Sequence, residues 1–452
     1  MIHPRIRQRR LNPCDCVFHG FDHLLRQRGY GGAATFMVVE LAEPLSPQAV
    51  RHALGRAMEQ HPVLASAATV SRWRAWPYWT CPGDIVPPHV TCTDLGGHLD
   101  WASAADELCA ANLSCGWDPA LPPPVRIELY SGPGCTRLCL RWPHALMDAD
   151  GAQWVLSEMD RLAAEPARER PAALLSDDVH IDPLAGFGPL RRWALLLRRA
   201  ARRRRPISLL GSSLAMSLPE RPAESRRLRY LVRHWSEETT KRMQAAAQDV
   251  TPPGPALYSR YLAACTLRAV DRLHKEHGRQ LPVCGLMFPM RVPGVTARPL
   301  PGNYLVAAPL LIAPELLGDR RALGAEIARQ LQDFRDQDGE RSSWTLQHLL
   351  ARLRVRQYRG LLRWETQRQP FVTGFSFYGE IDPPLRSILG ARVTNLYGSG
   401  VISIPPAWNV TFSRFAERIN MVIAWPDEAF PPTVVERAAD LIEEEALWKS
   451  GN

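Results

Sequence analysis

Segments typical of strands and of helices alternate along most of the chain, and this mixture constrains the fold more than any other feature. Small, β-branched and aromatic residues from Ala33 to Leu41 predict a strand. Ser46 and Pro47 then provide an N-cap and a first-turn proline for a helix that ends near His61. Further strands are predicted at 63–70, 125–130, 136–142, 284–290, 304–312, 371–378, 392–396, 408–413 and 419–425. Further helices are predicted at 100–112, 151–164, 255–274, 320–335, 343–364 and 432–448. The sequence therefore predicts a mixed α/β fold.

The 452 residues exceed what one ordinary hydrophobic core holds, so the chain is expected to form two lobes. The segment 164–227 differs from its surroundings. It holds many prolines and an unbroken arginine tract, and it shows no strand period. We predict an N-terminal lobe at 1–180, a basic, proline-rich crossover at 181–227 and a C-terminal lobe at 228–452.

Composition excludes several classes of protein. The formal charge of +9 permits acidic partners, but no helix-turn-helix, zinc-finger or aromatic RNA-binding signature is present, so nucleic acid is not an expected partner. The ten cysteines lack the spacing of metal ligands, and no metal site is expected. The longest apolar stretch, Tyr304 to Ala313, is too short to span a bilayer, and the first residues lack the apolar core of a signal peptide. A cytoplasmic location is expected.

One short segment carries the residues suited to catalysis. His144 and Asp148 are separated by three residues between a predicted strand and the helix that Gly151 opens. With an ordinary pKa of about 6.5, a neutral imidazole can accept a proton near neutral pH, as a base that activates an alcohol or amine must do. Asp148 could fix the loop by pairing with a cation, or it could cap the following helix.

This segment resembles the His-x-x-x-Asp signature of condensation domains and related acyltransferases of the chloramphenicol acetyltransferase superfamily. Other elements are similar in order and spacing. They are Gln60 to Leu64 at the end of the first long helix, Pro123 to Arg126 before the active-site strand, Pro289 to Arg291 followed by Gly302 to Tyr304, and Gly374 to Gly379. The resemblance implies two chloramphenicol-acetyltransferase-like lobes with an active-site channel between them.

The resemblance also implies roles for single residues. His144 would be the general base, Asp148 its structural partner, and Arg291 the cation from the second lobe that pairs with Asp148. Asn303, Ser376 and Asn409 would line the channel, and the last two are candidates to stabilise the oxyanion. The co-substrate would be an acyl thioester, either of coenzyme A or of a phosphopantetheinyl acyl-carrier protein. No tightly bound cofactor would be needed. The acceptor would be a small alcohol or amine, in secondary metabolism or lipid biosynthesis.

Two positions depart from the pattern of the amide-forming members. Pro143 stands where they carry a second histidine, and Ala149 stands where a glycine usually follows the aspartate. An acyltransferase that forms esters or amides is therefore our main interpretation. A carrier-protein-dependent, amide-forming condensation enzyme is the alternative within the family. A non-catalytic scaffold that binds carrier proteins is the alternative outside enzymes.

A basic and apolar run from Leu190 to Arg205 stands apart from the catalytic pattern. It could be the solvated face of a helix, a docking site for an acidic acyl-carrier protein, or a peripheral membrane contact on anionic lipid. Its candidate docking residues are Arg198, Arg199, Arg202, Arg203, Arg204 and Arg205.

Overall fold

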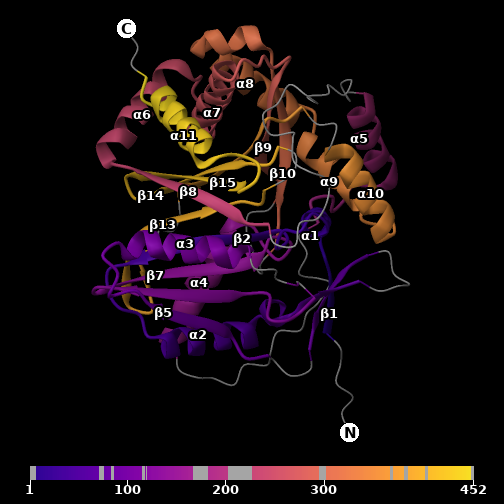
Figure 1. Cartoon of the computed structure of the whole chain (residues 1–452). Coiled ribbons are helices and arrows are strands. Elements are labelled where there is room, and N and C mark those ends of the chain that lie inside the picture. Colours follow the sequence, from indigo (N-terminus) through magenta and orange to yellow (C-terminus); the bar gives the residue numbers. More distant parts are fainter. Residues whose placement is uncertain are drawn as a thin grey trace.

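The chain folds into two lobes, each built on a six-stranded sheet (Figure 1). The computed structural model describes residues 7–70, 76–82, 86–114, 118, 120–165, 182–201, 226–294, 302–366, 370–380, 385–402 and 406–448. The indigo and magenta half of the chain forms most of the lower lobe in Figure 1. The red to yellow half forms the upper lobe.

The first-lobe sheet has the strand order β12-β13-β2-β7-β6-β5. Its long central strands are antiparallel, while β5 and β6 are parallel. Helices α2 and α4 pack over one face of this sheet, and α3 packs over the other and reaches β8 of the second lobe. The bounds are α2 Pro47–Gln60, α3 Trp101–Ser114, α4 Ala149–Ala164, β2 Ala34–Leu41, β5 His89–Asp94, β6 Arg126–Gly132, β7 Cys135–Pro143, β12 Ser387–Ile388 and β13 Ala391–Ser399.

The second-lobe sheet has the strand order β10-β9-β11-β14-β15-β8. Helices α6, α7, α8 and α11 gather above it and enclose the largest hydrophobic core (Figure 1). The bounds are β8 Leu228–Trp235, β9 Cys284–Arg291, β10 Leu305–Ile312, β11 Thr373–Glu380, β14 Asn409–Phe415, β15 Arg418–Pro426, α6 Glu237–Val250, α7 Leu257–Glu276, α8 Arg320–Asp336 and α11 Pro432–Ala446.

The remaining elements lie at the side of the lobes. A small sheet has the order β1-β4-β3, and α1 packs against α9 and α10. The bounds are β1 Arg7–Arg10, β3 Ala67–Thr69, β4 Tyr78–Cys81, α1 Pro13–Gln27, α5 Pro189–Ala201, α9 Gly339–Leu350, α10 Val355–Thr366 and two short 3-10 helices, Pro62–Ala65 and Pro314–Gly318.

Most of the predicted elements are confirmed, and α2 is the clearest case. Its N-cap Ser46 accepts a hydrogen bond from the N–H of Ala49, and its apolar residues face the core, as their helical spacing predicts. Two predictions differ from the structure. The strand expected at 63–70 is a 3-10 turn followed by the three-residue β3, and the helix expected at 343–364 is two helices, α9 and α10.

The predicted division of the chain at residue 227 does not separate the two lobes. β13, from the C-terminal half, completes the first-lobe sheet by pairing with β2, with Leu396 opposite Val39. Without β13, that edge of β2 would present unpaired backbone N–H and C=O groups in the interior. The chain therefore returns to the first lobe at 387–399 before β14 and β15 complete the second.

Candidate active site

His144 lies where β7 ends and the chain turns toward α4. Its backbone N–H donates to the carbonyl of Ala33 at 2.9 Å, which extends the pairing of β7 with β2. The indole N–H of Trp142 donates to the carbonyl of Met147 at 2.9 Å and closes the turn from beneath. These two hydrogen bonds hold the backbone of His144 in place at the end of the strand.

Asn303 lies in the second lobe, two residues before β10, and contacts His144 of the first lobe. The Nδ1 atom of His144 lies 3.0 Å from Oδ1 of Asn303, and Nδ2 of Asn303 donates to the His144 carbonyl at 2.8 Å. Nδ2 also donates to Oδ1 of Asp15 at 2.8 Å. The Asn303 side chain is fully buried. The predicted residue Asn303 is therefore in direct contact with the predicted base.

These contacts fix the tautomer of His144. One neighbour of the amide nitrogen of Asn303 is the backbone carbonyl of His144, which only accepts hydrogen bonds, so the nitrogen must face it and the oxygen must face the imidazole. The amide oxygen can only accept, so Nδ1 of His144 carries the ring proton. The lone pair of the neutral ring is then on Nε2, which makes no hydrogen bond to any described residue. Nε2 is the atom that can take a proton from a substrate.

Asp15 anchors the amide of Asn303 from the first helix, and the sequence interpretation did not identify it. Its Oδ1 accepts from the backbone N–H of Asn303 at 3.1 Å as well as from Nδ2, and its Oδ2 accepts from the N–H of Asn12 at 3.0 Å. Burial raises the pKa of the Asp15 carboxyl to about 7, while these donors and the charge of Arg9 act to lower it.

Phe18, one turn further along α1, stacks on the imidazole. The ring centroids of Phe18 and His144 are 3.7 Å apart with an angle of 10° between the planes. Burial lowers the pKa of His144 to about 4. The backbone of His144 itself and the side chain of Asn303 have smaller effects that raise it. The ring is therefore neutral throughout the physiological range, in the form that a general base requires.

Asp148 joins the turn after β7 to the second lobe. It is the N-cap of α4, where its Oδ1 accepts from the N–H of Gly151 at 3.1 Å. Its own N–H donates to the carbonyl of Gly302 at 3.3 Å, and its Oδ2 accepts from the N–H of Tyr304 at 3.4 Å. Asp148 thus holds the residues on both sides of Asn303, which places the amide against His144.

Arg291 takes a different partner from the one the resemblance implied. In the described residues it forms its ion pair with Asp150, on the first turn of α4, and not with Asp148. The reason is position. Asp148 is buried at the helix N-terminus and directed at backbone N–H groups, whereas Asp150 and Arg291 are both partly exposed. Arg291 therefore forms an ion pair between the lobes, but its partner, Asp150, lies two residues after the one that was predicted.

Ser376 and Asn409 lie together on the second-lobe sheet. Asn409 pairs with Gly374 across β14 and β11, and its Nδ2 donates to Oγ1 of Thr411 at 2.8 Å. A side chain built at Gly400 would meet both Asn409 and Ser376, so the two polar groups face the same space as Gly400. Tyr378 lies two residues beyond Ser376 on β11, and burial raises its pKa above the usual range, with the charge of Asp148 acting in the same direction. The sequence interpretation did not identify Tyr378.

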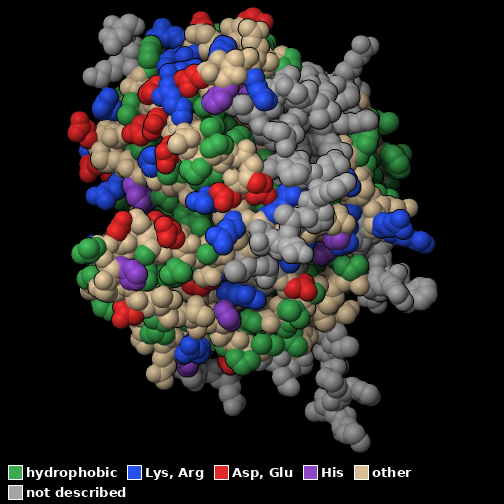
Figure 2. Space-filling view, in the orientation of Figure 1, with side chains coloured by type: hydrophobic (Ala, Val, Ile, Leu, Met, Phe, Trp, Pro, Cys, Tyr) green, Lys and Arg blue, Asp and Glu red, His purple; other side chains and the backbone are tan. Residues whose placement is uncertain are grey.

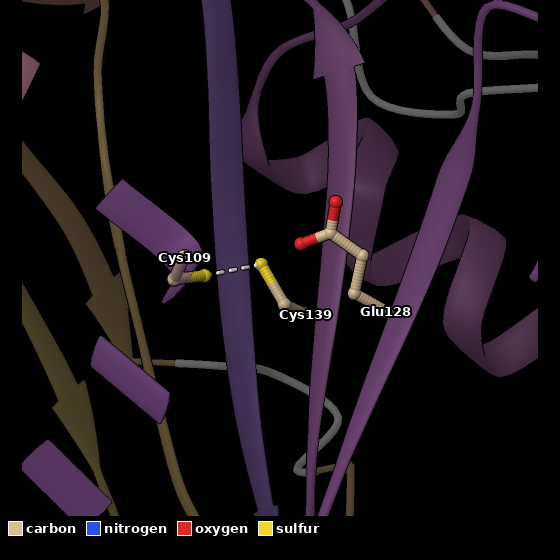
Figure 3. Close-up of side chains that lie close together, drawn as sticks. All are labelled: Cys109, Glu128 and Cys139. Carbon is tan, nitrogen blue, oxygen red and sulfur yellow. Dashed lines mark hydrogen bonds between the residues drawn. The ribbon is translucent and has the colours of Figure 1, made fainter. Parts of the chain in front are cut away.

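One buried cluster in the described residues has the composition of a metal site, Cys109, Glu128 and Cys139 (Figure 3). The two sulfur atoms are 2.9 Å apart. Both carboxylate oxygens of Glu128 are already used, because one accepts from Arg141 and the other from the hydroxyl of Tyr130 at 2.8 Å. Burial also raises the pKa of the Cys139 thiol, which opposes the thiolate that a metal ion needs. The cluster is better suited to a neutral core.

The basic run lies only in part within the described residues. Arg198 and Arg199 are on α5; Arg198 is exposed, and Arg199 donates to the hydroxyl of Ser343 on α9 at 2.6 Å. Arg202, Arg203, Arg204 and Arg205 lie outside the described residues. Of the helices that the structure describes, none combines the length and the apolar character needed to cross a membrane.

Comparison with solved structures gives the family of folds to which these lobes belong. The first condensation domain of the calcium-dependent antibiotic synthetase, in complex with a substrate analogue, superposes with a TM-score of 0.70 at 17% sequence identity, over 99% of this chain and 98% of that one. The chain has the condensation-domain fold. The resemblance inferred from the sequence, and the two-lobed architecture that it implied, are confirmed.

Two more proteins with the condensation-domain fold show how widely it is used. The polyketide synthase associated protein 5 from Mycobacterium tuberculosis has a TM-score of 0.63 at 16% identity, with both chains covered completely. A mutant of the starter condensation domain of rhizomide synthetase, in complex with C8-CoA and Leu-SNAC, has a TM-score of 0.64 at 14% identity, over 98% of this chain and 94% of that one. No family model matches the sequence, and no curated protein matches it either.

Proposed function

We propose that this chain is an acyltransferase in which Nε2 of His144 takes the proton from a hydroxyl or amine as that group attacks the carbonyl of an acyl thioester. A carbon–oxygen or carbon–nitrogen bond forms and the carbon–sulfur bond breaks. The imidazolium returns its proton to the departing thiolate, so the ring ends neutral. No covalent acyl-enzyme and no metal ion take part in this scheme.

The observation that carries the proposal is the fixed tautomer of His144. The hydrogen bond between Nδ1 and Oδ1 of Asn303 leaves Nε2 as the basic atom, and burial keeps the ring neutral. In a protein with the condensation-domain fold, this base lies where the two lobes meet, since Asn303 and Asp148 join them there. An ordered base of this kind also argues against the non-catalytic scaffold, for which no neutral, oriented imidazole would be needed.

The choice of donor and acceptor follows from the comparisons. The fold is shared with condensation domains, and one of those structures holds an acyl-CoA and an aminoacyl thioester analogue. We therefore favour a carrier-bound or coenzyme A thioester as donor. The main interpretation from sequence allowed either an ester or an amide product, and we now favour an amine as acceptor, which is the amide-forming alternative. Ser376, Asn409 and Tyr378 are the candidates for the groups that stabilise the oxyanion or line the substrate channel.

The proposal is tested with purified full-length protein, acyl-CoA and acyl-SNAC thioesters of graded chain length, and panels of amines and alcohols. Thiol release is followed colorimetrically and products are identified by mass spectrometry. We expect His144→Ala to lower turnover by about 10²- to 10⁴-fold, as expected for loss of a general base. A matched control is His274→Ala, which removes a buried histidine of α7 in the second lobe and should keep turnover. Equal turnover in wild type and His144→Ala would refute the proposed mechanism.

A further inference from the structure

Helix α5 exposes three large apolar side chains on one stripe. Leu190 is 85% exposed, Trp193 is 61% exposed and Leu197 is 67% exposed. Their spacing of three and four residues places them along one side of the helix. On another side, Leu195 is buried in the second-lobe core and Arg199 bonds to Ser343 of α9. The helix is thus fixed to the protein by one face and presents a second apolar face outward.

The outward stripe has a positively charged border. Helix α5 contains four arginines and no acidic residue. Arg191 and Arg198 are seven residues apart, so they share one flank of the stripe, and both are exposed. Arg191 lies over the ring of Phe187 at 3.8 Å, and Arg198 forms no ion pair with any described residue. No carboxylate of α5 itself compensates this charge.

Helix α10 adds further positive charge on the same side of the molecule. Figure 1 shows α5, α9 and α10 grouped at one edge, and Figure 2 shows green side chains at the edge where α5 lies. On α10, Arg356 and Arg363 are exposed and Trp364 is 41% exposed. Apolar side chains, a tryptophan and arginines therefore occur together on α5, and this combination is typical of helices that lie in a membrane interface.

We propose that α5 docks this protein on an anionic membrane surface. Leu190, Trp193 and Leu197 would enter the boundary between the headgroups and the acyl chains, while Arg191 and Arg198 would contact lipid phosphates. The charge of the border selects an anionic partner, and the three protruding apolar side chains need a fluid apolar phase to enter. At 13 residues, α5 is too short to span a bilayer, so the contact is peripheral. The inference does not depend on the proposed acyl transfer.

Flotation of the full-length protein with lipid vesicles tests this docking. We expect binding to vesicles of phosphatidylcholine mixed with phosphatidylglycerol, and much weaker binding to phosphatidylcholine alone. Trp193→Ser combined with Leu197→Ser should reduce partitioning by at least about tenfold. Arg191→Ser combined with Arg198→Ser should reduce it by about fivefold for each arginine, and by less as salt is raised.

The matched control is Leu99→Ser combined with Leu121→Ser, which removes two exposed leucines of the first lobe and should leave partitioning unchanged. Melting temperatures of all variants are compared, since exposed positions should not alter folding. Absence of binding to the anionic vesicles, or equal losses in the control, would overturn the proposal. Vesicle binding that survives both α5 variants, or α5 variants that lose only the binding of a purified acyl-carrier protein, would overturn it as well.

Discussion

Replacement of Asn303 by alanine should disable the base without touching the base itself. The substitution removes the acceptor for the Nδ1 proton of His144 and the donor to the His144 carbonyl and to Oδ1 of Asp15. Asp15 keeps the backbone N–H groups of Asn12 and Asn303, so its carboxylate remains partly compensated. The specific loss is the hydrogen bond that decides which ring nitrogen is protonated.

The size of the effect follows from those bonds. One hydrogen bond contributes about 0.5–1.5 kcal/mol, so losing the bond to Nδ1 shifts the tautomer ratio by up to about tenfold. The ring also loses part of its orientation, and small misplacements of a reacting group cost up to about 10²-fold in rate. We expect turnover to fall by about 10- to 100-fold. The free energy of unfolding should fall by about 3 kcal/mol, because three polar atoms lose a partner: Nδ1 and the carbonyl oxygen of His144, and Oδ1 of Asp15.

Steady-state turnover, melting temperature and ¹⁵N NMR of protein labelled in its histidine rings measure these effects separately. The control is Asn420→Ala, which removes a fully buried amide that bonds to Asn395, Leu396 and Ser413 far from His144 in the chain. It should lose stability but keep turnover and the His144 spectrum. If Asn303→Ala retains the Nδ1-protonated ring and wild-type turnover, the assignment of the tautomer to Asn303 is refuted.

Three further predictions concern pH and the contacts between the lobes. Because burial lowers the pKa of His144 from 6.5 to about 4, the unfolded chain binds the proton first as pH falls from about 6.5 to 4. The stability that the neutral ring contributes should be lost in that pH window. The acid limb of kcat/KM that is due to His144 should also lie well below pH 6.5. An inflection of kcat/KM at pH 6.5 that vanishes in His144→Ala would contradict this. Asp148→Ala should lower the free energy of unfolding by about 2–3 kcal/mol in urea titrations, because it removes an N-cap and a bond to Tyr304. Arg291→Ala should lower the free energy of unfolding by at most about 1 kcal/mol, because its ion pair with Asp150 is exposed. Equal losses in Asp148→Ala and Arg291→Ala would instead support the pairing of Arg291 with Asp148 that the resemblance implied.

Helices α2 and α1 show what the periodicity of the sequence could and could not predict. Helix α2 has an apolar stripe and a clear N-cap, and its predicted bounds agree with the structure. Helix α1 was missed because its buried face includes Asp15, His19 and Asp22, which interrupt the apolar period. One signal was available. Asn12 and Asp15 have the spacing of a capping box, with Pro13 at the first helical position, and the structure shows that box.

Tertiary pairings account for the other differences. Residues 351–354 separate α9 from α10 without glycine or proline, so no local signal marked the break. β13 returns to the first lobe because it pairs with β2, and the hydrophobic pattern of one sequence does not tell which strands pair. Arg291 pairs with Asp150 and not with Asp148, because the first turn of α4 leaves the Asp150 carboxylate partly exposed and buries that of Asp148.

A third residue, Asn303, connects His144 and Asp148. The three residues between them span the turn from the end of β7 to the N-cap of α4, so the spacing is that of a strand-to-helix turn. Within the part of the chain that the structure describes, no hydrogen bond joins His144 and Asp148 directly. Instead, Asp148 holds the backbone on both sides of Asn303, and Asn303 holds the imidazole. Because α1 supplies Asp15, three segments far apart in sequence must assemble before the base is oriented. In the proposed mechanism, the short motif supplies the base, and contacts from both lobes are needed to orient it.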